Sequence, residues 1–220
     1  MAPESPKQPA PKRPPAPVTG PAVETPTVVT KLPPLFRRVD WIGFVITCVL
    51  VFAGYLYTIA PDLTLQDSGE LAVGSYYAGV PHPPGYPVWT IYTWFFTVII
   101  PFGNIAFRVA VSSAFAGALS CGLISLMVSR GSSMFIESVA ELKNIERRIE
   151  SGICLVSGLV AGLLMGFNGF MWSQSIIVEV YSLSMLSLTG GLLCLLHWAE
   201  FVLLHSKNYQ KTCIRYEPSF

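Results

Sequence analysis

Charged residues are scarce in this sequence. They make up 12% of its 220 residues, whereas an ordinary soluble domain carries about 25%. Acidic and basic residues nearly balance, giving a formal net charge of +1, so the chain lacks the basic excess typical of nucleic-acid-binding domains. Hydrophobic residues account for 52% of the sequence. This composition excludes an ordinary soluble domain and predicts an integral membrane protein, with the lipid bilayer as a partner and no nucleic acid.

Paired cysteine motifs are also lacking. Five cysteines are present, and no CxxC spacing occurs among them. Most of them lie inside apolar runs, where a thiol behaves as a small buried apolar group. A cysteine-based metal site is therefore not supported, and the thiols are expected to be buried in helices. The cysteines are Cys48, Cys121, Cys154, Cys194 and Cys213.

The first 36 residues lack any long apolar run. Residues 1–34 hold eleven of the eighteen prolines, and such a segment cannot bury a core. A disordered or locally polyproline II cytoplasmic tail is therefore expected for residues 1–36. Because the first apolar run starts only at Trp41, this end does not resemble a signal peptide.

Long apolar runs organise the rest of the chain. Membrane-spanning helices are expected at residues 41–60, 109–129, 153–170 and 181–204. A further apolar run at 88–100 lies between two prolines and is short for a crossing, which favours an interfacial or re-entrant helix. The expected fold is an all-α polytopic membrane protein with four or five transmembrane helices and short interfacial helices in an external loop.

The basic residues predict an orientation. Arg37 and Arg38 precede the first span, and basic residues recur in the linker 130–150 and in the tail 205–220. By the positive-inside rule these parts and the N-terminus are cytoplasmic. A crossing by residues 88–100 would move the basic linker outside, so the rule favours four spans over five.

Two features of the sequence are expected to have a structural role and no chemical one. The charged residues at 137–150 are expected to form a helix with a solvated face on the cytoplasmic surface. Small residues recur every four positions in the second and third spans, which lets helices approach closely. These residues are Ala114, Ala118 and Gly122, then Gly158, Gly162 and Gly166.

One long polar segment interrupts the apolar sequence, and the orientation places it outside. Asp67 and Glu70 lie three residues apart, so they share a face if the segment is helical. His82 follows in a proline-rich turn. A structural alternative is a capping box in which Asp67 caps a helix at 68–78 and Glu70 lies at position N3. Ionisable groups beside a membrane are costly, which makes this segment the leading candidate for a functional site.

The order of the motifs resembles the GT-C glycosyltransferases, polytopic enzymes that use a lipid-phosphate-linked sugar on the external face. Within them, the chain resembles a protein O-mannosyltransferase-related family long catalogued as a domain of unknown function. The resemblance covers roughly residues 36–204 and implies a GT-C-like N-terminal module. Its motifs are DSGEL at 67–71, HPPGYP at 82–87, GN at 103–104, Arg108, Trp172 and EVY at 179–181.

The resemblance also implies roles for individual residues. Asp67 would be the catalytic base for an acceptor hydroxyl, and Glu70 would orient Asp67, raise its pKa or help to hold a divalent metal. His82 and Arg108 would meet the donor phosphate, although a turn histidine and an interfacial anchor are the structural alternatives. The other candidate substrate-binding residues are Tyr86, Trp172, Glu179 and Tyr181. A divalent metal is the one cofactor that the resemblance leaves open, and beyond the role named for Glu70 it assigns no metal ligands.

The implied activity is transfer of a sugar from a polyprenyl-phosphate donor to a protein or glycan acceptor, in a bacterial inner membrane or the ER membrane. Enzymes of this kind have about twice as many spans or more, so the chain is expected to be an N-terminal fragment. A non-catalytic truncated protein or partner subunit stays open as an alternative. A transporter component is disfavoured, because within the apolar runs only His197 and Glu200 are ionisable.

Overall fold

The computed structural model describes residues 35–64, 67–142 and 145–215, with side chains up to residue 203. Within these residues the secondary structure is helical, and four helices are long and apolar enough to cross a membrane. The expectation of an all-α polytopic membrane protein is therefore confirmed. The tail predicted for residues 1–34 lies outside the described residues. The four long helices are α1 (Arg38–Thr58), α4 (Ile105–Ser138), α5 (Arg147–Gly166) and α7 (Tyr181–Arg215).

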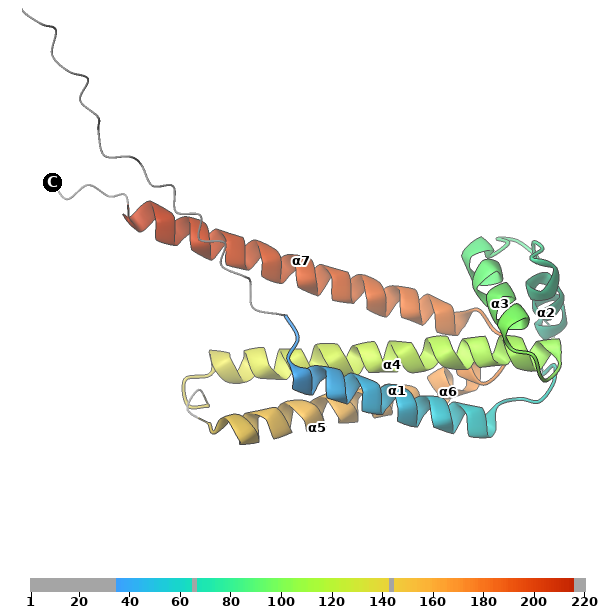
Figure 1. Ribbon diagram of the computed structural model, residues 1–220, viewed down its shortest axis with the longest axis horizontal. Helices are drawn as coiled ribbons and strands as arrows, with labels where there is room; N and C mark the ends of the chain where they lie inside the picture. The colour runs from blue at the N-terminus through green and yellow to red at the C-terminus, as the bar shows by residue number, and fades with distance from the viewer. Residues whose placement is uncertain (1–34, 65–66, 143–144, 216–220) are drawn as a thin grey trace, which may run out of the picture. The chain divides into compact units, whose positions relative to one another are not determined.

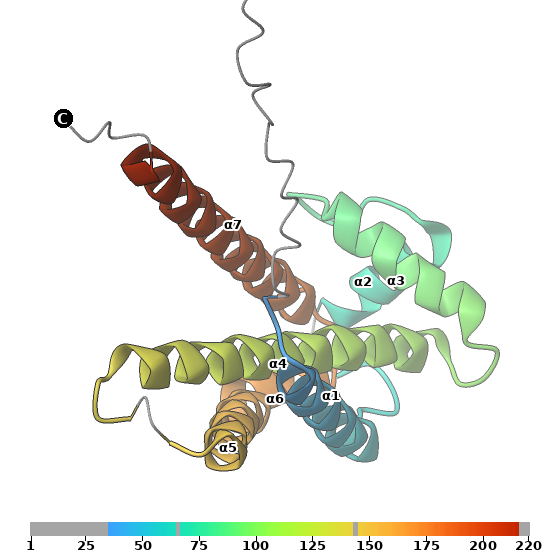
Figure 2. The same cartoon turned by 60° about the vertical axis from the view of Figure 1, so that its left-hand side comes forward.

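Helices α1, α4 and α5 lie side by side, whereas α7 packs on α4 and then diverges from it (Figures 1 and 2). Only 6% of the apolar window of α7 is buried inside the protein, compared with 61% for α4. α4 is thus the central helix of the bundle, and most of the apolar surface of α7 is left to face lipid or other helices.

The glycines of α5 explain how closely this helix approaches α4. A Cβ atom at Gly158 would lie 2.7 Å from the carbonyl oxygen of Ser125, and one at Gly162 would lie 2.9 Å from the carbonyl oxygen of Cys121. A carbon atom cannot be held that near a backbone oxygen, so these positions need glycine for the two backbones to meet. The small-residue pattern of the sequence is therefore confirmed as a packing surface.

A polar network joins the three bundle helices at the end that carries the 139–146 linker, called here the linker end. Asp40 is fully buried, and it accepts hydrogen bonds from Ser129 Oγ at 2.5 Å and from the Arg37 backbone nitrogen at 2.7 Å. The guanidinium of Arg37 pairs with Glu150 at 2.6 Å. A buried carboxylate is tolerated here because its charge is paired and hydrogen-bonded.

The helix predicted for residues 137–150 is wrong. α4 continues to Ser138, α5 begins only at Arg147, and the described residues between them form turns and bends. Some charged residues near this linker form ion pairs between helices instead of facing solvent. Arg130 lies within α4 and pairs with Glu200 of α7 at 3.2 Å, so Glu200 holds two helices together.

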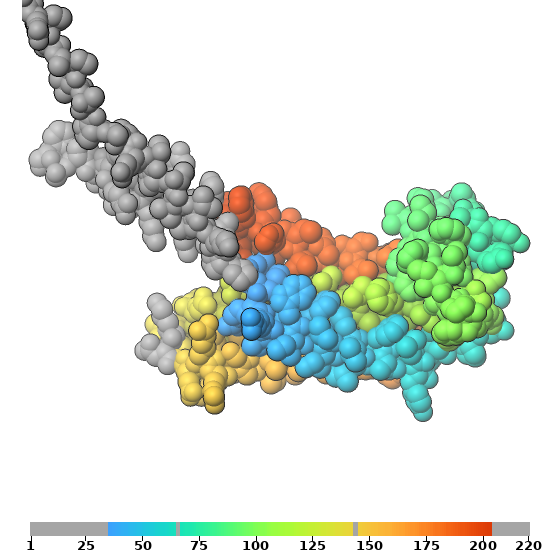
Figure 3. Space-filling model, viewed as in Figure 1, coloured from blue at the N-terminus to red at the C-terminus, as the bar shows by residue number. Residues whose placement is uncertain are grey.

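Two short helices, α2 (Ser68–Tyr77) and α3 (Pro87–Ile99), form a knob at the other end of the bundle, called here the α2–α3 end (Figure 3). α3 is inside out. Thr90, Thr93 and Thr97 are buried, and their hydroxyls bond carbonyls of the preceding turn. Val88 and Val98 point outward and are 73% and 63% exposed. Such a helix, too short to cross and apolar on its outer side, suits a membrane interface.

Candidate active site

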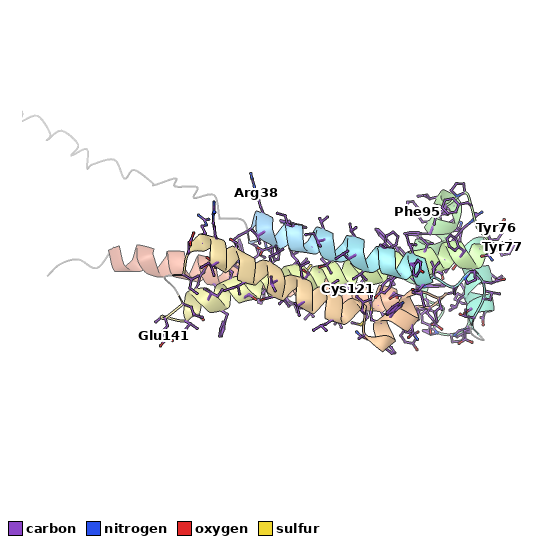
Figure 4. All side chains as sticks on the ribbon, turned by 90° about the horizontal axis from the view of Figure 1, so that it is seen from below. Arg38, Tyr76, Tyr77, Phe95, Cys121 and Glu141 are labelled. Atoms are coloured by element: carbon purple, nitrogen blue, oxygen red, sulfur yellow. The ribbon has the colours of Figure 1, made fainter. Side chains whose placement is uncertain are left out.

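Asp67 lies at the α2–α3 end, where Figure 4 also labels Tyr76, Tyr77 and Phe95, far from Glu141 at the linker end. Asp67 stands directly before α2 with its side chain exposed, and that side chain makes no capping hydrogen bond. A capping box needs this carboxylate to accept a hydrogen bond from the first turn. The capping-box alternative is therefore wrong, and α2 does not use the Asp67 carboxylate.

Glu70 holds the HPPGYP turn. Its Oε1 accepts a hydrogen bond from the backbone nitrogen of His82 at 2.6 Å, and its Oε2 lies 3.1 Å from His82 Nδ1. The backbone bond first, and then the ring bond, lower the pKa of Glu70. Both oxygens of Glu70 are thus engaged with His82, which is a role that the spacing of Asp67 and Glu70 does not suggest.

The turn itself fixes the direction of the His82 ring. With Nδ1 held by Glu70, Nε2 necessarily points away from that carboxylate. Tyr86 lies edge-on to His82, with ring centroids 5.9 Å apart. Gly85 and Tyr86 have φ angles of 87° and 39°, in the left-handed region that glycine adopts readily and tyrosine rarely. This backbone brings Tyr86 back beside His82 and against the core between α2 and α3.

Glu179 reaches the same end from a distant part of the sequence. Its carbonyl oxygen accepts hydrogen bonds from Trp89 Nε1 of α3 and Ser113 Oγ of α4, each at 3.2 Å. Burial raises the pKa of the Glu179 carboxyl; the charge of Asp67 raises it further, and His82 acts in the opposite direction. The charges of Asp67 and His82 therefore each act on the Glu179 carboxyl.

Arg108 lies in the first turn of α4 and reaches back to the end of α3. Its Nε donates to the carbonyls of Phe102 and Gly103 at 3.3 and 3.2 Å, and its Nη1 donates to the carbonyl of Thr97 at 3.0 Å. The guanidinium thus caps the last turn of α3. The ion pairs found among the described residues do not include Arg108, so contact with a donor phosphate stays a prediction.

Trp172 and Tyr181 make packing contacts around α6 (Gly169–Ser175). Trp172 Nε1 donates to Thr58 Oγ1 at 2.9 Å, and its ring lies edge-on to Phe167. Tyr181 is half exposed and lies edge-on to Phe170. Sugar stacking by these two rings stays a prediction.

Sequence reasoning missed Trp89 and Ser113, the two residues that hold Glu179. Both sit inside apolar helices, and no spacing links them to position 179. In the part of the chain that the structure describes, no group of three or more His, Cys, Asp or Glu residues could hold a metal ion. The site is therefore a carboxylate and histidine arrangement built on α2, the HPPGYP turn and the connection before α7.

Comparison with known proteins identifies relatives of this chain. Mouse Protein O-mannosyl-transferase TMEM260 is 30% identical over 142 residues, which are 64% of this chain and 17% of the mouse protein. Protein O-mannosyl-transferase tmem260 of Dictyostelium discoideum is 28% identical over 139 residues, 63% of this chain and 14% of that protein. The chain thus matches less than a fifth of the length of these relatives, and no solved structure matches it.

A family model described as the Protein O-mannosyl-transferase TMEM260 N-terminal domain matches residues 67–214. The match begins at Asp67 and includes every residue singled out above for the candidate site. It confirms the resemblance to a protein O-mannosyltransferase-related family that the DSGEL and HPPGYP motifs carry. The chain is a multi-pass membrane protein that belongs to the TMEM260 N-terminal domain family of protein O-mannosyltransferases.

Proposed function

We propose that this protein takes part in transfer of a mannosyl residue from a polyprenyl-phosphate donor to a hydroxyl of a protein acceptor, as a GT-C-type glycosyltransferase. The observation that carries the proposal is the exposed carboxylate of Asp67, which α2 does not use. The charge of Asp67 acts on Glu179, and Glu70 holds His82 three residues along α2 from Asp67. The names of the relatives, which are O-mannosyl-transferases, support mannosyl transfer.

The proposed reaction is a single displacement. The acceptor hydroxyl gives its proton to the Asp67 carboxylate as its oxygen forms a bond to the anomeric carbon. The bond between that carbon and the phosphate oxygen breaks, and its electron pair leaves with the polyprenyl phosphate. Attack from the face opposite the leaving group inverts the anomeric configuration.

The neighbours of Asp67 have supporting roles in this proposal. His82 presents Nε2 to the donor phosphate, with its ring held by Glu70. Glu179 meets a sugar hydroxyl from a position fixed by Trp89 and Ser113. Arg108 contributes by holding the end of α3, and any contact that it makes with phosphate would use nitrogen atoms beyond those that already donate.

The proposed orientation puts the α2–α3 end outside, or in the lumen, and the N-terminus in the cytoplasm. Arg38, Arg147 and Arg148 gather at the linker end, which supports this choice. A cysteine at Val80 should react with an impermeant thiol reagent added outside, and one at Ser138 should not, in a background without native cysteines. Both positions are exposed, so equal labelling of the two would overturn the orientation.

The test of the activity is Asp67→Asn. Asparagine keeps the size of the side chain, and no capping bond is lost. Transfer from a labelled polyprenyl-phosphate mannose to a peptide rich in Ser and Thr should fall about 10²–10⁴-fold, the usual effect of losing a general base. The matched control is Glu141→Gln, an exposed acid at the linker end.

Transfer by the Asp67→Asn variant at the wild-type rate would show that Asp67 is not the catalytic base. Absence of transfer by the wild-type protein, with insertion intact, would favour the non-catalytic alternative.

A further inference from the structure

A hollow opens at the α2–α3 end, beside α2. It has a volume of about 380 Å³ and lies between the loop after α1, α2 and the start of α4. Ala72, Val73 and Ile105 contribute an apolar floor, and Asp62, Tyr76 and Tyr77 line it as well. We call it the tyrosine pocket. Nothing in the proposed chemistry at Asp67, His82 and Glu179 uses these residues.

The helix geometry separates this pocket from the Glu70–His82 pair. Gly69, Ala72, Val73 and Tyr76 form one stripe along α2, with the spacing i, i+3, i+4 and i+7. Glu70 and Gly74 form the neighbouring stripe, and Pro81 packs against Gly74. The Glu70–His82 pair and most of the tyrosine pocket therefore lie on different faces of α2, while Tyr77, seven residues after Glu70, borders both. Asp67 stands directly before this helix.

This placement fits the requirement of an in-line displacement. The acceptor oxygen must approach the anomeric carbon from the face opposite the phosphate. If the donor phosphate meets His82 on one face of α2, the acceptor must come from another face and still reach Asp67. Gly69, which lines the tyrosine pocket, is two residues after Asp67 and so lies on nearly the opposite side of the start of α2. An acceptor segment held in the pocket would therefore pass around this end of the helix to bring its hydroxyl to Asp67.

The lining of the pocket selects a class of side chain. None of the described residues that line it is basic, and Asp62 and both tyrosines are exposed. The two tyrosine rings lie edge to face with centroids 4.9 Å apart (Figure 4). An apolar floor with a carboxylate and aromatic rings suits a long basic side chain, whose methylenes pack on apolar surface while its charge meets the acid and the rings.

We propose that the tyrosine pocket is the acceptor-docking site, and that it binds a Lys or Arg side chain of an extended acceptor segment next to the Ser or Thr that receives the sugar. This proposal rests on the proposed function for its acceptor, although binding itself can be measured without transfer. Docking along α2 would bring the hydroxyl toward Asp67, and the requirement for a basic neighbour gives the reaction a sequence preference.

The first test measures binding without catalysis. Tyr77→p-benzoylphenylalanine is introduced into the protein in nanodiscs, and a fluorescent Ser/Thr peptide with one Lys is added under ultraviolet light. The protein should crosslink to this peptide, less to a matched peptide with Glu in place of Lys, and less again after Asp62→Asn. The control is the same photoreactive residue at Val98, which is also exposed but lies on the outer side of α3.

The second test measures transfer. Asp62→Asn and Tyr76→Ala should each raise KM for the Lys peptide about 3- to 10-fold, the size expected for an exposed ion pair or a cation–π contact. Neither substitution should change KM for the donor. Val98→Ala should leave KM for the peptide and KM for the donor unchanged. Asp62→Asn should also abolish the preference for Lys over Glu.

The outcomes separate the two proposals. Crosslinking with the stated peptide preference but no transfer would support the pocket and defeat the proposed function. Transfer with no crosslink, no Lys preference and unchanged KM would overturn the pocket and leave the function standing. A photoadduct whose mass is that of a phospholipid would show that the pocket binds lipid and would also overturn the acceptor assignment.

Discussion

The two ends of the helix bundle both carry clustered acids, but their surroundings differ. At the linker end, Asp40 is fully buried and bound by Ser129 and by the backbone of Arg37, whose guanidinium pairs with Glu150. At the α2–α3 end, Asp67 is exposed and makes no capping bond. The Asp40 carboxylate therefore has its hydrogen-bonding capacity used inside the bundle, whereas the Asp67 carboxylate is not used to cap α2.

The contrast gives a criterion for separating acidic residues with a structural role from those with a functional role beside a membrane. An ionisable group at this depth is costly and suggests a function by default. Hydrogen-bond and ion-pair partners weaken that inference of function, because a carboxylate in a network that joins three helices already has a structural role. By this criterion Asp40, Glu150 and Glu200 hold the bundle together and Glu70 holds a turn. The Asp67 carboxylate neither caps α2 nor joins helices in the part of the chain that the structure describes, so it stays the candidate for catalysis.

The largest effect on folding should come from Asp40→Ala. This change leaves Ser129 and the start of α1 without their buried partner, and breaking a buried ionic network costs about 3–5 kcal/mol. We expect a large fall in Tm in detergent, while transfer per folded molecule is retained. Glu141→Ala, at an exposed position of the same end, is the control. A stable Asp40→Ala protein would erase the distinction between the two ends.

A smaller loss is expected from Gly162→Ala. The added carbon would lie 2.9 Å from the Cys121 carbonyl and 2.6 Å from Thr47 Cγ2, so α5 must move away from its neighbours. Overpacking of this kind costs about 1–3 kcal/mol, to be read as a lower Tm. Gly152→Ala is matched to it, because it lies on the same helix with nothing within 4 Å of the added carbon. Equal Tm values would show that the glycine stripe does not set the packing.

Much of the bundle could be predicted from the sequence because its signals are local and repeated. Apolar runs fix the spans, and small residues at every fourth position fix the face on which α5 meets α4. The helix predicted at 137–150 is replaced by turns between α4 and α5. The charge pairs at this end were also not predicted. The pairing of Arg130 with Glu200, and of Arg37 with Glu150, depends on which helices become neighbours, and a linear charge pattern does not contain that information.

The candidate site divides in the same way. The motifs locate the acids and His82, but their spacing pairs Glu70 with Asp67, whereas the structure pairs Glu70 with His82. Between these two residues the chain reverses direction at Ala78, which ends α2 in the left-handed conformation. Trp89 and Ser113 hold the backbone carbonyl of Glu179 through hydrogen bonds between three segments that are far apart in the sequence. No local pattern in any one of these segments predicts those bonds.

The smallest effect should come from Glu179→Gln, and it should depend on pH. Burial raises the pKa of Glu179 in the folded protein, so the folded state binds more protons than the unfolded state above the ordinary pKa of a glutamate. The contribution of this group to stability is therefore present at low pH and is lost as pH rises through the folded-state pKa. Glutamine removes that loss, so the variant should have a slightly higher Tm than wild type at pH 7 and an equal Tm near pH 4. The measurement is Tm against pH for both proteins in detergent, with Glu141→Gln as the exposed control. A Tm difference that is the same at both pH values would mean that the raised pKa plays no part, and that Glu179 resembles the paired acids of the linker end.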